Sequence, residues 1–115
     1  MRRGDIVLVS LDPVVGSEQG KVRPGVIVSS DAANIAAERA GRGVITVVPV
    51  TSNVAAVYPF QTLLVPEDSG LARVGKAQAE QVRSVSVERV VRTVGAVSAE
   101  RMADVDEALR RHLSL

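Results

Sequence analysis

The 115-residue sequence contains no cysteine, no tryptophan and only one histidine, His112. The lack of cysteine excludes a disulfide framework, a thiolate zinc site and a cysteine nucleophile. A single histidine excludes a His-based metal cluster and a nuclease that uses two histidines. We therefore expect neither a metal site nor a cofactor.

An excess of one charge is also lacking, because 14 Lys and Arg stand against 13 Asp and Glu, for a net charge of +1. This balance excludes a globally basic coat for nucleic acid and leaves room for a local basic patch. Arginine supplies most of the cations, and its forked guanidinium suits phosphate groups. No apolar run reaches the roughly 18 residues of a membrane span, so we expect a cytoplasmic protein without membrane attachment.

Valine is abundant, and its β-branched side chain favours strands. The valines occur in short runs that end at glycine, proline, aspartate or serine, as strands between turns do. The length suits one compact domain over residues 1–115. The predicted strands span residues 6–11, 25–29, 43–50, 61–65, 76–85 and 93–97.

Two helices are expected. The first spans residues 31–38, with Asp31 as an acidic N-cap. The second begins at Ser98, and its apolar positions recur every three or four residues, which gives one apolar face. We predict a mainly β fold with helices (α+β), in which a small, strongly bent antiparallel barrel carries helices outside, one of them at the C-terminus.

Three segments carry candidate functional residues, each with an ordinary structural alternative. Residues 12–24 form a polar loop that either holds functional groups or only keeps the protein soluble. Arg23 precedes a proline, so its backbone is extended, and it either binds phosphate or is an ordinary solvated arginine. Thr51 and Ser52 follow a strand and either present hydroxyls to a ligand or close a local Ser/Thr turn.

Two further patterns are open to two interpretations. Tyr58 and Phe60 are the aromatic residues of the chain and either stack on bases or fill the core, which we expect for Phe60. Gln81 and Arg83 alternate with apolar neighbours, so they share one face of the predicted strand. That face is either a surface that reads RNA or simply the solvated side of the sheet.

Taken in order, these segments resemble the MazF/PemK family of toxins. The matching segments are Arg3-Gly4-Asp5-Ile6, Asp12-Pro13, Gly16-Ser17-Glu18-Gln19, Arg23-Pro24, Val48-Pro49-Val50-Thr51-Ser52, Tyr58-Pro59-Phe60 and Glu80-Gln81-Val82-Arg83-Ser84. No tripeptide is decisive alone, but the ordered set is specific and covers residues 3–84.

The resemblance implies a homodimeric SH3-like barrel of the CcdB/PemK type, the toxin of a type II toxin–antitoxin pair. It implies an endoribonuclease that cuts single-stranded RNA at short sequences, independently of the ribosome and without a metal. The 2′-OH attacks the adjacent phosphorus and leaves 2′,3′-cyclic phosphate and 5′-OH ends. The implied partners are the RNA substrate and a MazE-like antitoxin with an acidic, disordered tail.

By position in the motifs, the essential arginine and threonine of the family correspond to Arg23 and Thr51. Glu18 is the carboxylate that the motif offers as a base or as an organiser of its loop. The residues expected to contact RNA are Ser17, Gln19, Lys21, Ser52, Gln81 and Arg83. Two alternatives remain, a gyrase poison of the CcdB type, which needs no cleavage residues, and an inactive paralogue that only binds.

Overall fold

The computed structural model describes residues 1–11, 16–17 and 21–115. Glu18 and Gln19, two of the predicted site residues, lie outside the described residues. The strands are β1 (Asp5–Ser10), β2 (Val22–Ile27), β3 (Val44–Thr51), β4 (Gln61–Leu64), β5 (Gly75–Gln78), β6 (Arg83–Ser86) and β7 (Val90–Ala96). The helices are α1 (Asp31–Ala40), α2 (Pro66–Ser69) and α3 (Ala99–Leu113), with 3₁₀ turns η1 (Ala79–Gln81) and η2 (Val87–Arg89).

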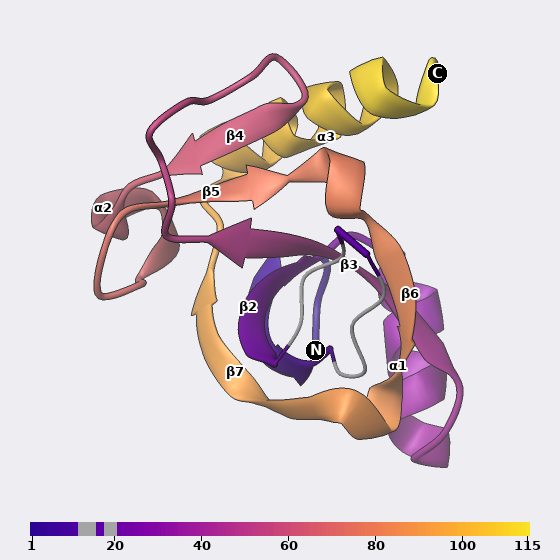
Figure 1. Cartoon of the computed structure of the whole chain (residues 1–115). Coiled ribbons are helices and arrows are strands. Elements are labelled where there is room, and N and C mark those ends of the chain that lie inside the picture. Colours follow the sequence, from indigo (N-terminus) through magenta and orange to yellow (C-terminus); the bar gives the residue numbers. More distant parts are fainter. Residues whose placement is uncertain (12–15, 18–20) are drawn as a thin grey trace.

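The strands form one antiparallel sheet of seven strands in the order β4-β5-β3-β2-β1-β7, with β6 also paired to β3. The long strand β3 joins the two halves of the sheet, because its start pairs with β6 and its end pairs with β5. Figure 1 shows the sheet curling around itself, with α3 across one end and α1 at the opposite corner. Within the described residues no ladder joins β4 to β7, so the sheet is strongly bent but not closed.

The valine runs are explained by burial on both faces of the sheet. Along β1, Ile6 packs in a core cluster with Val105 of α3, whereas Val7 and Val9 pack in a second cluster near Ala37 of α1. Strand β3 divides its side chains between the same two clusters. A strand covered on both faces needs apolar residues at successive positions, so these strands do not alternate with polar residues.

Both long helices begin at a serine N-cap. The Ser30 hydroxyl accepts a hydrogen bond from the Ala33 N–H, and Ser98 accepts one from the Arg101 N–H. The prediction of Asp31 as N-cap was therefore wrong by one residue, because Ser30 takes the extended cap conformation and Asp31 is the first helical residue. An acidic residue there still suits the positive end of the helix dipole.

The predicted strand over residues 76–85 is two strands separated by the turn η1. Pairing explains the break: Val50 of β3 faces Ala77 of β5, whereas Val47 faces Arg83 of β6. The segment from Ala77 to Arg83 is therefore three residues longer than the segment from Val47 to Val50 that it faces. The turn η1 holds these extra residues at the corner of the sheet. Gln81 lies in this turn, so the predicted strand face shared by Gln81 and Arg83 was wrong.

The predicted fold class is confirmed, since the protein is mainly β, antiparallel and strongly bent with a C-terminal helix. Two strands begin three residues earlier than expected, at Val22 and Val90, and the short helix α2 was not predicted. Of the helices in the described part of the chain, none has the length and apolar character needed to span a bilayer.

Candidate active site

A surface pocket of about 360 Å³ opens where β2 begins and β3 ends. Its third wall is the connection between α2 and β5. The lining residues are Arg23, Pro24, Val50, Thr51, Ser52, Leu71, Ala72, Arg73, Val74 and Gly75. The pocket thus brings together Arg23, Thr51 and Ser52, which the sequence predicts as site residues from two segments far apart in the chain.

Arg23 lies near the start of β2, where the strand leaves the core. The first residues of β2 are exposed and the last three are buried, so an arginine here keeps its guanidinium in solvent. The following Pro24 restricts the Arg23 backbone to an extended conformation, and Arg23 pairs with Val9 across the sheet. This strand fixes the point from which the Arg23 side chain lines the edge of the pocket.

Thr51 ends β3, and its hydroxyl has a defined hydrogen bond. The Asn53 N–H donates to Thr51 Oγ1 at 3.2 Å, and the Ala55 N–H donates to Asn53 Oδ1 at 3.3 Å. The alternative of a local Ser/Thr turn is therefore confirmed for Thr51. A hydroxyl that accepts one hydrogen bond still has its own proton to donate, so this turn leaves Thr51 able to bind an anionic oxygen.

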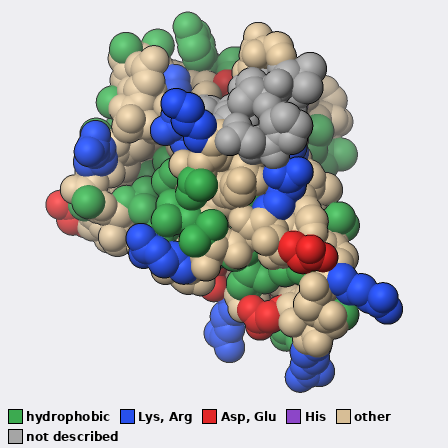
Figure 2. Space-filling model, turned by 60° about the horizontal axis from the view of Figure 1, so that its bottom comes forward, with side chains coloured by type: hydrophobic (Ala, Val, Ile, Leu, Met, Phe, Trp, Pro, Cys, Tyr) green, Lys and Arg blue, Asp and Glu red, His purple; other side chains and the backbone are tan. Residues whose placement is uncertain are grey.

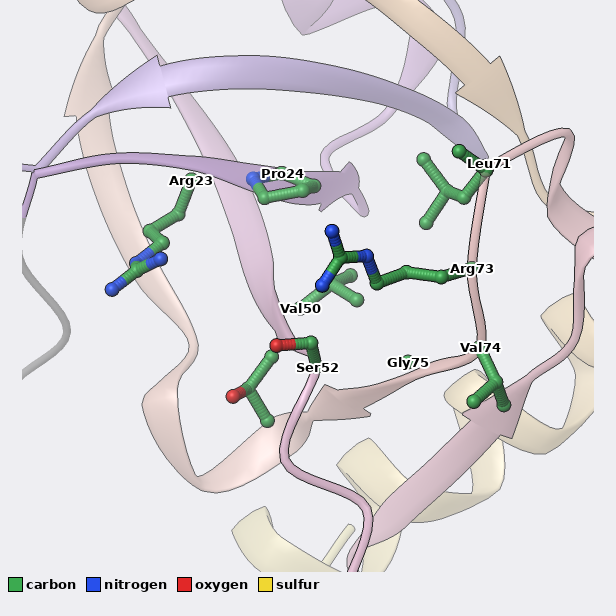
Figure 3. Close-up of a pocket in the computed structure, with 10 residues that line it drawn as sticks. Arg23, Pro24, Val50, Ser52, Leu71, Arg73, Val74 and Gly75 are labelled. Atoms are coloured by element: carbon green, nitrogen blue, oxygen red, sulfur yellow. The ribbon is translucent and has the colours of Figure 1, made fainter.

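The described lining of the pocket carries positive charge and no carboxylate. Among its described lining residues Arg23 and Arg73 are charged, and none is Asp or Glu. In Figure 3 the Arg73 guanidinium extends over Ser52, while the Arg23 guanidinium points to the other side. Such an arrangement attracts anions, because no acidic group of the described lining offsets the two cations.

The surface as a whole also shows an uneven distribution of charge. On the face in Figure 2, several Lys and Arg side chains lie around an apolar patch, and among the coloured side chains next to this patch blue outnumbers red. Both signs alternate in the lower part of the same view. A nearly neutral chain thus presents a locally basic surface.

Comparison with known proteins identifies the family. A family described as "PemK-like, MazF-like toxin of type II toxin-antitoxin system" matches residues 2–113. Endoribonuclease MazF9 of Mycobacterium tuberculosis is 59% identical over 115 residues, which cover 100% of this chain and 98% of the relative. The chain belongs to this toxin family. The family predicted from the sequence is confirmed, and the name of the relative agrees with the predicted enzyme class.

Solved structures agree with the fold of the toxin. A crystal structure of MazF from Deinococcus radiodurans is 27% identical with a TM-score of 0.78, covering 100% of this chain and 97% of the other. A MazE-MazF crystal structure from the same organism is 26% identical with a TM-score of 0.72, covering 100% and 96%.

The remaining described site residues lie outside the pocket of the toxin. Gln81 Nε2 donates to the Ser17 carbonyl oxygen at 3.4 Å, so the turn η1 contacts the loop between β1 and β2. Lys21 is exposed, with a left-handed backbone (φ 62°). Arg83 begins β6 opposite Val47. Neither cation belongs to the pocket lining, and both have interactions elsewhere in the protein.

Arg73 is the charged residue of the described pocket lining that the sequence did not predict. It lies in the irregular connection between α2 and β5, outside every motif of the resemblance. One arginine among twelve carries no local signal. Gly75, two residues further on, indicates only that another segment of backbone comes close at this point.

The two aromatic residues form a stacked pair and do not fill the core. The rings of Tyr58 and Phe60 lie 5.6 Å apart at 11°, and Tyr58 is 53% exposed. The assignment of Phe60 to the core was wrong, since it is only half-buried. A small sheet that packs valines on both faces has little space for a large ring.

Buried polar groups hold the loop that carries this pair. Lys76 Nζ donates to the Ala56 carbonyl oxygen at 2.6 Å and lies 5.8 Å from the Tyr58 ring centroid. Gln61 Oε1 accepts from the Tyr58 N–H at 3.1 Å, and Gln61 Nε2 donates to Glu80 Oε2 at 2.5 Å. The loop after Thr51 is therefore tied to β4, β5 and η1.

Within residues 1–11, 16–17 and 21–115, no group of three His, Cys, Asp or Glu residues has a geometry that would hold a metal ion. The pocket itself offers guanidinium and hydroxyl groups, which bind anions. The described lining therefore suits the stabilisation of negative charge.

Proposed function

We propose that the pocket around Arg23 and Thr51 cleaves single-stranded RNA at short sequences, independently of the ribosome and without a metal. One observation carries this proposal. Two residues that the family motif marks as essential come from different strands and line one pocket whose described lining contains no carboxylate. A phosphodiester is an anion that gains negative charge during cleavage, so this pocket favours its transition state.

The proposed step is transfer of the phosphoryl group within the RNA. The 2′-oxygen forms a bond to phosphorus, its proton passes to a base, and the bond to the 5′-oxygen breaks. The 5′-oxygen takes up a proton, so the products are a 2′,3′-cyclic phosphate and a 5′-OH. Arg23 and the Thr51 hydroxyl would donate hydrogen bonds to the phosphorane oxygens.

Proton transfer needs a group beyond Arg23 and Thr51, because a guanidinium is a poor acid and does not act as a base. We assign this role to Glu18, as the base or as an organiser of the loop. The contact between Gln81 and Ser17 supports a functional role for this loop. Ser17, Gln19, Lys21, Ser52, Gln81 and Arg83 are the proposed RNA contacts.

The proposed protein partner is a MazE-like antitoxin with an acidic, disordered tail. The MazE-MazF structure from D. radiodurans supports such a partner, and a positively charged pocket attracts acidic residues. We also propose a cytoplasmic homodimer in which residues 1–115 act as one toxin domain.

The direct test is incubation of the protein with a long single-stranded RNA in EDTA, followed by analysis of the fragment ends. We expect cuts at a short recurring sequence that bear 2′,3′-cyclic phosphate and 5′-OH, at a rate that EDTA does not change. The Thr51→Val variant, which keeps the shape and loses the hydroxyl, should cut about 10 to 100 times more slowly.

Other outcomes separate the alternatives. Cleavage that EDTA stops and Mg²⁺ restores would contradict the proposed mechanism. An intact RNA together with gyrase binding would indicate a poison of the CcdB type, and an intact RNA that still binds would indicate an inactive paralogue.

A further inference from the structure

The pocket contains one arginine more than the proposed cleavage step requires. Arg23 and Thr51 suffice for the phosphate that is cut, and Arg73 extends into the same pocket from the opposite wall (Figure 3). We infer that Arg73 binds a second phosphate of the RNA, next to the one that is cut. This inference rests on the proposed function, because it assigns a further contact to the same substrate.

The segment that carries Arg73 is anchored at its start by α2. Gly70 ends this helix in the left-handed conformation (φ 73°), and its N–H donates to the Pro66 carbonyl oxygen at 2.8 Å. The buried Ser69 hydroxyl donates to the Val65 carbonyl oxygen at 3.0 Å and accepts from the Leu71 N–H at 3.2 Å. The chain therefore leaves α2 in a fixed direction, two residues before Arg73.

Contacts of α2 with the rest of the fold hold this anchor. The Ser98 N–H donates to the Asp68 carbonyl oxygen at 2.8 Å, which joins α2 to the start of α3. On its other side α2 lies against β7, where a Cβ added at Gly95 would come within 2.2 Å of the Ser69 carbonyl oxygen. The base of the Arg73 segment is thus part of the packed structure.

The end of the segment lies directly against the strand that carries Thr51. A Cβ added at Gly75 would lie 2.9 Å from Val50 Cγ1 and 3.0 Å from the Thr51 carbonyl oxygen. Glycine allows this close approach of two backbones. Gly75 contacts Thr51 and lies two residues after Arg73, so the backbone of Arg73 has a fixed position beside Thr51. This position sets where the Arg73 side chain starts relative to the cleavage site.

The charges of the pocket favour two anionic groups. Neither Arg23 nor Arg73 forms an ion pair with another described residue, whereas Arg101 on the other side of α2 contacts Glu100 and Asp104. Two cations in one pocket repel each other until anions neutralise them. Because the two guanidinium groups point to different sides of the pocket (Figure 3), each is placed to meet its own phosphate of one strand.

The test uses binding of an RNA that cannot be cut. The strand carries the sequence that the wild type cleaves, with a 2′-deoxy sugar at the cut, and binding is measured by fluorescence anisotropy. In a series of such strands a neutral methylphosphonate replaces one phosphate at a time. The proteins are the wild type, Arg73→Gln and the control Arg42→Gln, which changes an exposed arginine between α1 and β3.

We expect Arg73→Gln to weaken binding about 10-fold and to lower the slope of log affinity against log salt by about 0.7. One methylphosphonate, at a linkage beside the cut, should weaken binding to the wild type and to Arg42→Gln but not to Arg73→Gln. Loss of sensitivity at one linkage is a result that a merely structural role would not produce. Thermal unfolding should be unchanged, because Arg73 is exposed.

Two results would overturn the inference while leaving the proposed function intact. One is that each methylphosphonate weakens binding to Arg73→Gln by the same factor as it weakens binding to the wild type. The other is loss of sensitivity at the cut linkage itself, which would place Arg73 on the same phosphate as Arg23. If the wild type cuts no all-ribose RNA, the proposed function fails and this inference fails with it.

Discussion

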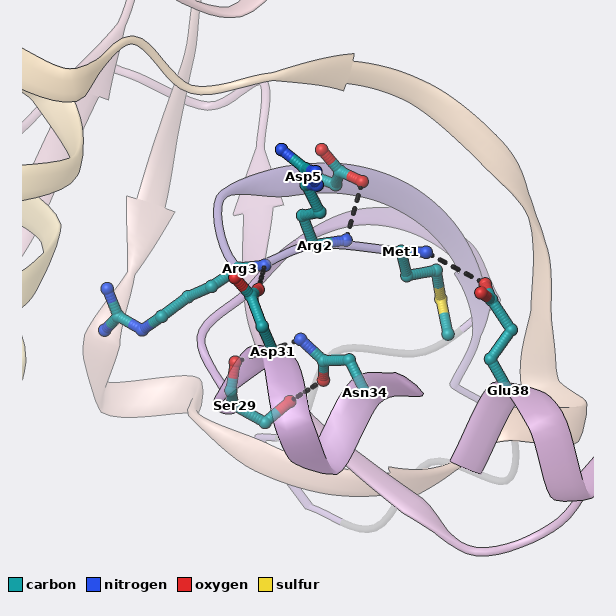
Figure 4. A network of polar contacts seen from close by, with 8 residues as sticks. All are labelled: Met1, Arg2, Arg3, Asp5, Ser29, Asp31, Asn34 and Glu38. Atoms are coloured by element: carbon teal, nitrogen blue, oxygen red, sulfur yellow. Dashed lines mark hydrogen bonds and ion pairs between the residues drawn. The ribbon is translucent and has the colours of Figure 1, made fainter. Parts of the chain in front are cut away.

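Two clusters of charged residues in this small protein differ in how their charges are balanced. At the N-terminus the Met1 ammonium group donates to Glu38 of α1 at 2.9 Å, and the Arg3 guanidinium donates to Asp106 of α3 at 2.6 Å. Figure 4 shows the part of this cluster around Met1 and Glu38, in which the Arg3 N–H also donates to Asp31 at 2.7 Å. The pocket contains two arginines and, in its described lining, no acidic residue.

The difference separates charges that hold the fold together from charges that are open to a ligand. The N-terminal segment joins β1 to both long helices through paired charges. The charges of Met1 and Arg3 are therefore balanced by carboxylates of the same chain. In the described lining of the pocket no acidic group offsets the cations, so they are open to an anionic ligand. Changes in the pocket should therefore alter activity, and changes in the N-terminal cluster should alter stability.

The largest expected effect is that of Arg23→Gln on cleavage. The variant keeps a polar side chain of similar length but loses the charge that stabilises the phosphorane. We expect the cleavage rate to fall about 100- to 1,000-fold, with the free energy of unfolding unchanged within about 0.5 kcal/mol because the side chain is exposed. Single-turnover cleavage and urea unfolding measure the two quantities. A normal cleavage rate in Arg23→Gln would contradict the assignment of the pocket charges to the ligand.

A smaller effect, on stability alone, is expected for Asn34→Ala in α1. Asn34 is fully buried, its Nδ2 donates to the Ser29 carbonyl oxygen at 3.0 Å, and its Oδ1 accepts from the Ser29 hydroxyl at 2.5 Å. Removing the amide takes away the partner of the Ser29 carbonyl oxygen and the acceptor of the Ser29 hydroxyl proton, while the Thr46 N–H still donates to that hydroxyl. The free energy of unfolding should fall by about 1–3 kcal/mol.

The control for this change is Arg39→Ala, an exposed position of the same helix, with an expected change within about 0.5 kcal/mol. Cleavage per folded molecule should match the wild type in both variants. A stable Asn34→Ala protein with impaired cleavage would show that the contact between Asn34 and Ser29 serves the active site.

The smallest effect is expected for Arg3→Gln. The side chains of Arg3 and Asp106 are 35% and 30% exposed, so solvent weakens their attraction. We expect a loss of about 0.5–1 kcal/mol in urea unfolding, reduced by high salt, and an unchanged cleavage rate. A double-mutant cycle with Asp106→Asn isolates the pair, and a coupling energy of zero would mean that the pair adds nothing to stability.

The sequence was sufficient where the signal is local or carried by a motif. Short valine runs with turn residues predicted the strands, and the apolar spacing after Ser98 predicted α3. The ordered motif led to the family and to Arg23 and Thr51, which the structure brings into one pocket. Their catalytic roles remain predictions.

Other features depend on contacts between distant segments. The break at Ala79–Gln81 follows from the pairing of β3 with two different strands, which no property of that segment predicts. The stacking of Tyr58 on Phe60 depends on Lys76 and Gln61, which hold the loop from neighbouring strands. Composition alone therefore misplaced Phe60 in the core.

The sequence by itself thus predicted most of the elements, the family and three residues of the pocket (Arg23, Thr51 and Ser52), because these are recorded in local pattern and ordered motif. Only the tertiary structure placed Arg73 opposite Arg23. That placement depends on the close approach of Gly75 to Thr51 and of Gly95 to Ser69. Backbone contacts between segments far apart in the chain decide where an irregular connection lies, and they leave no periodic pattern in the sequence.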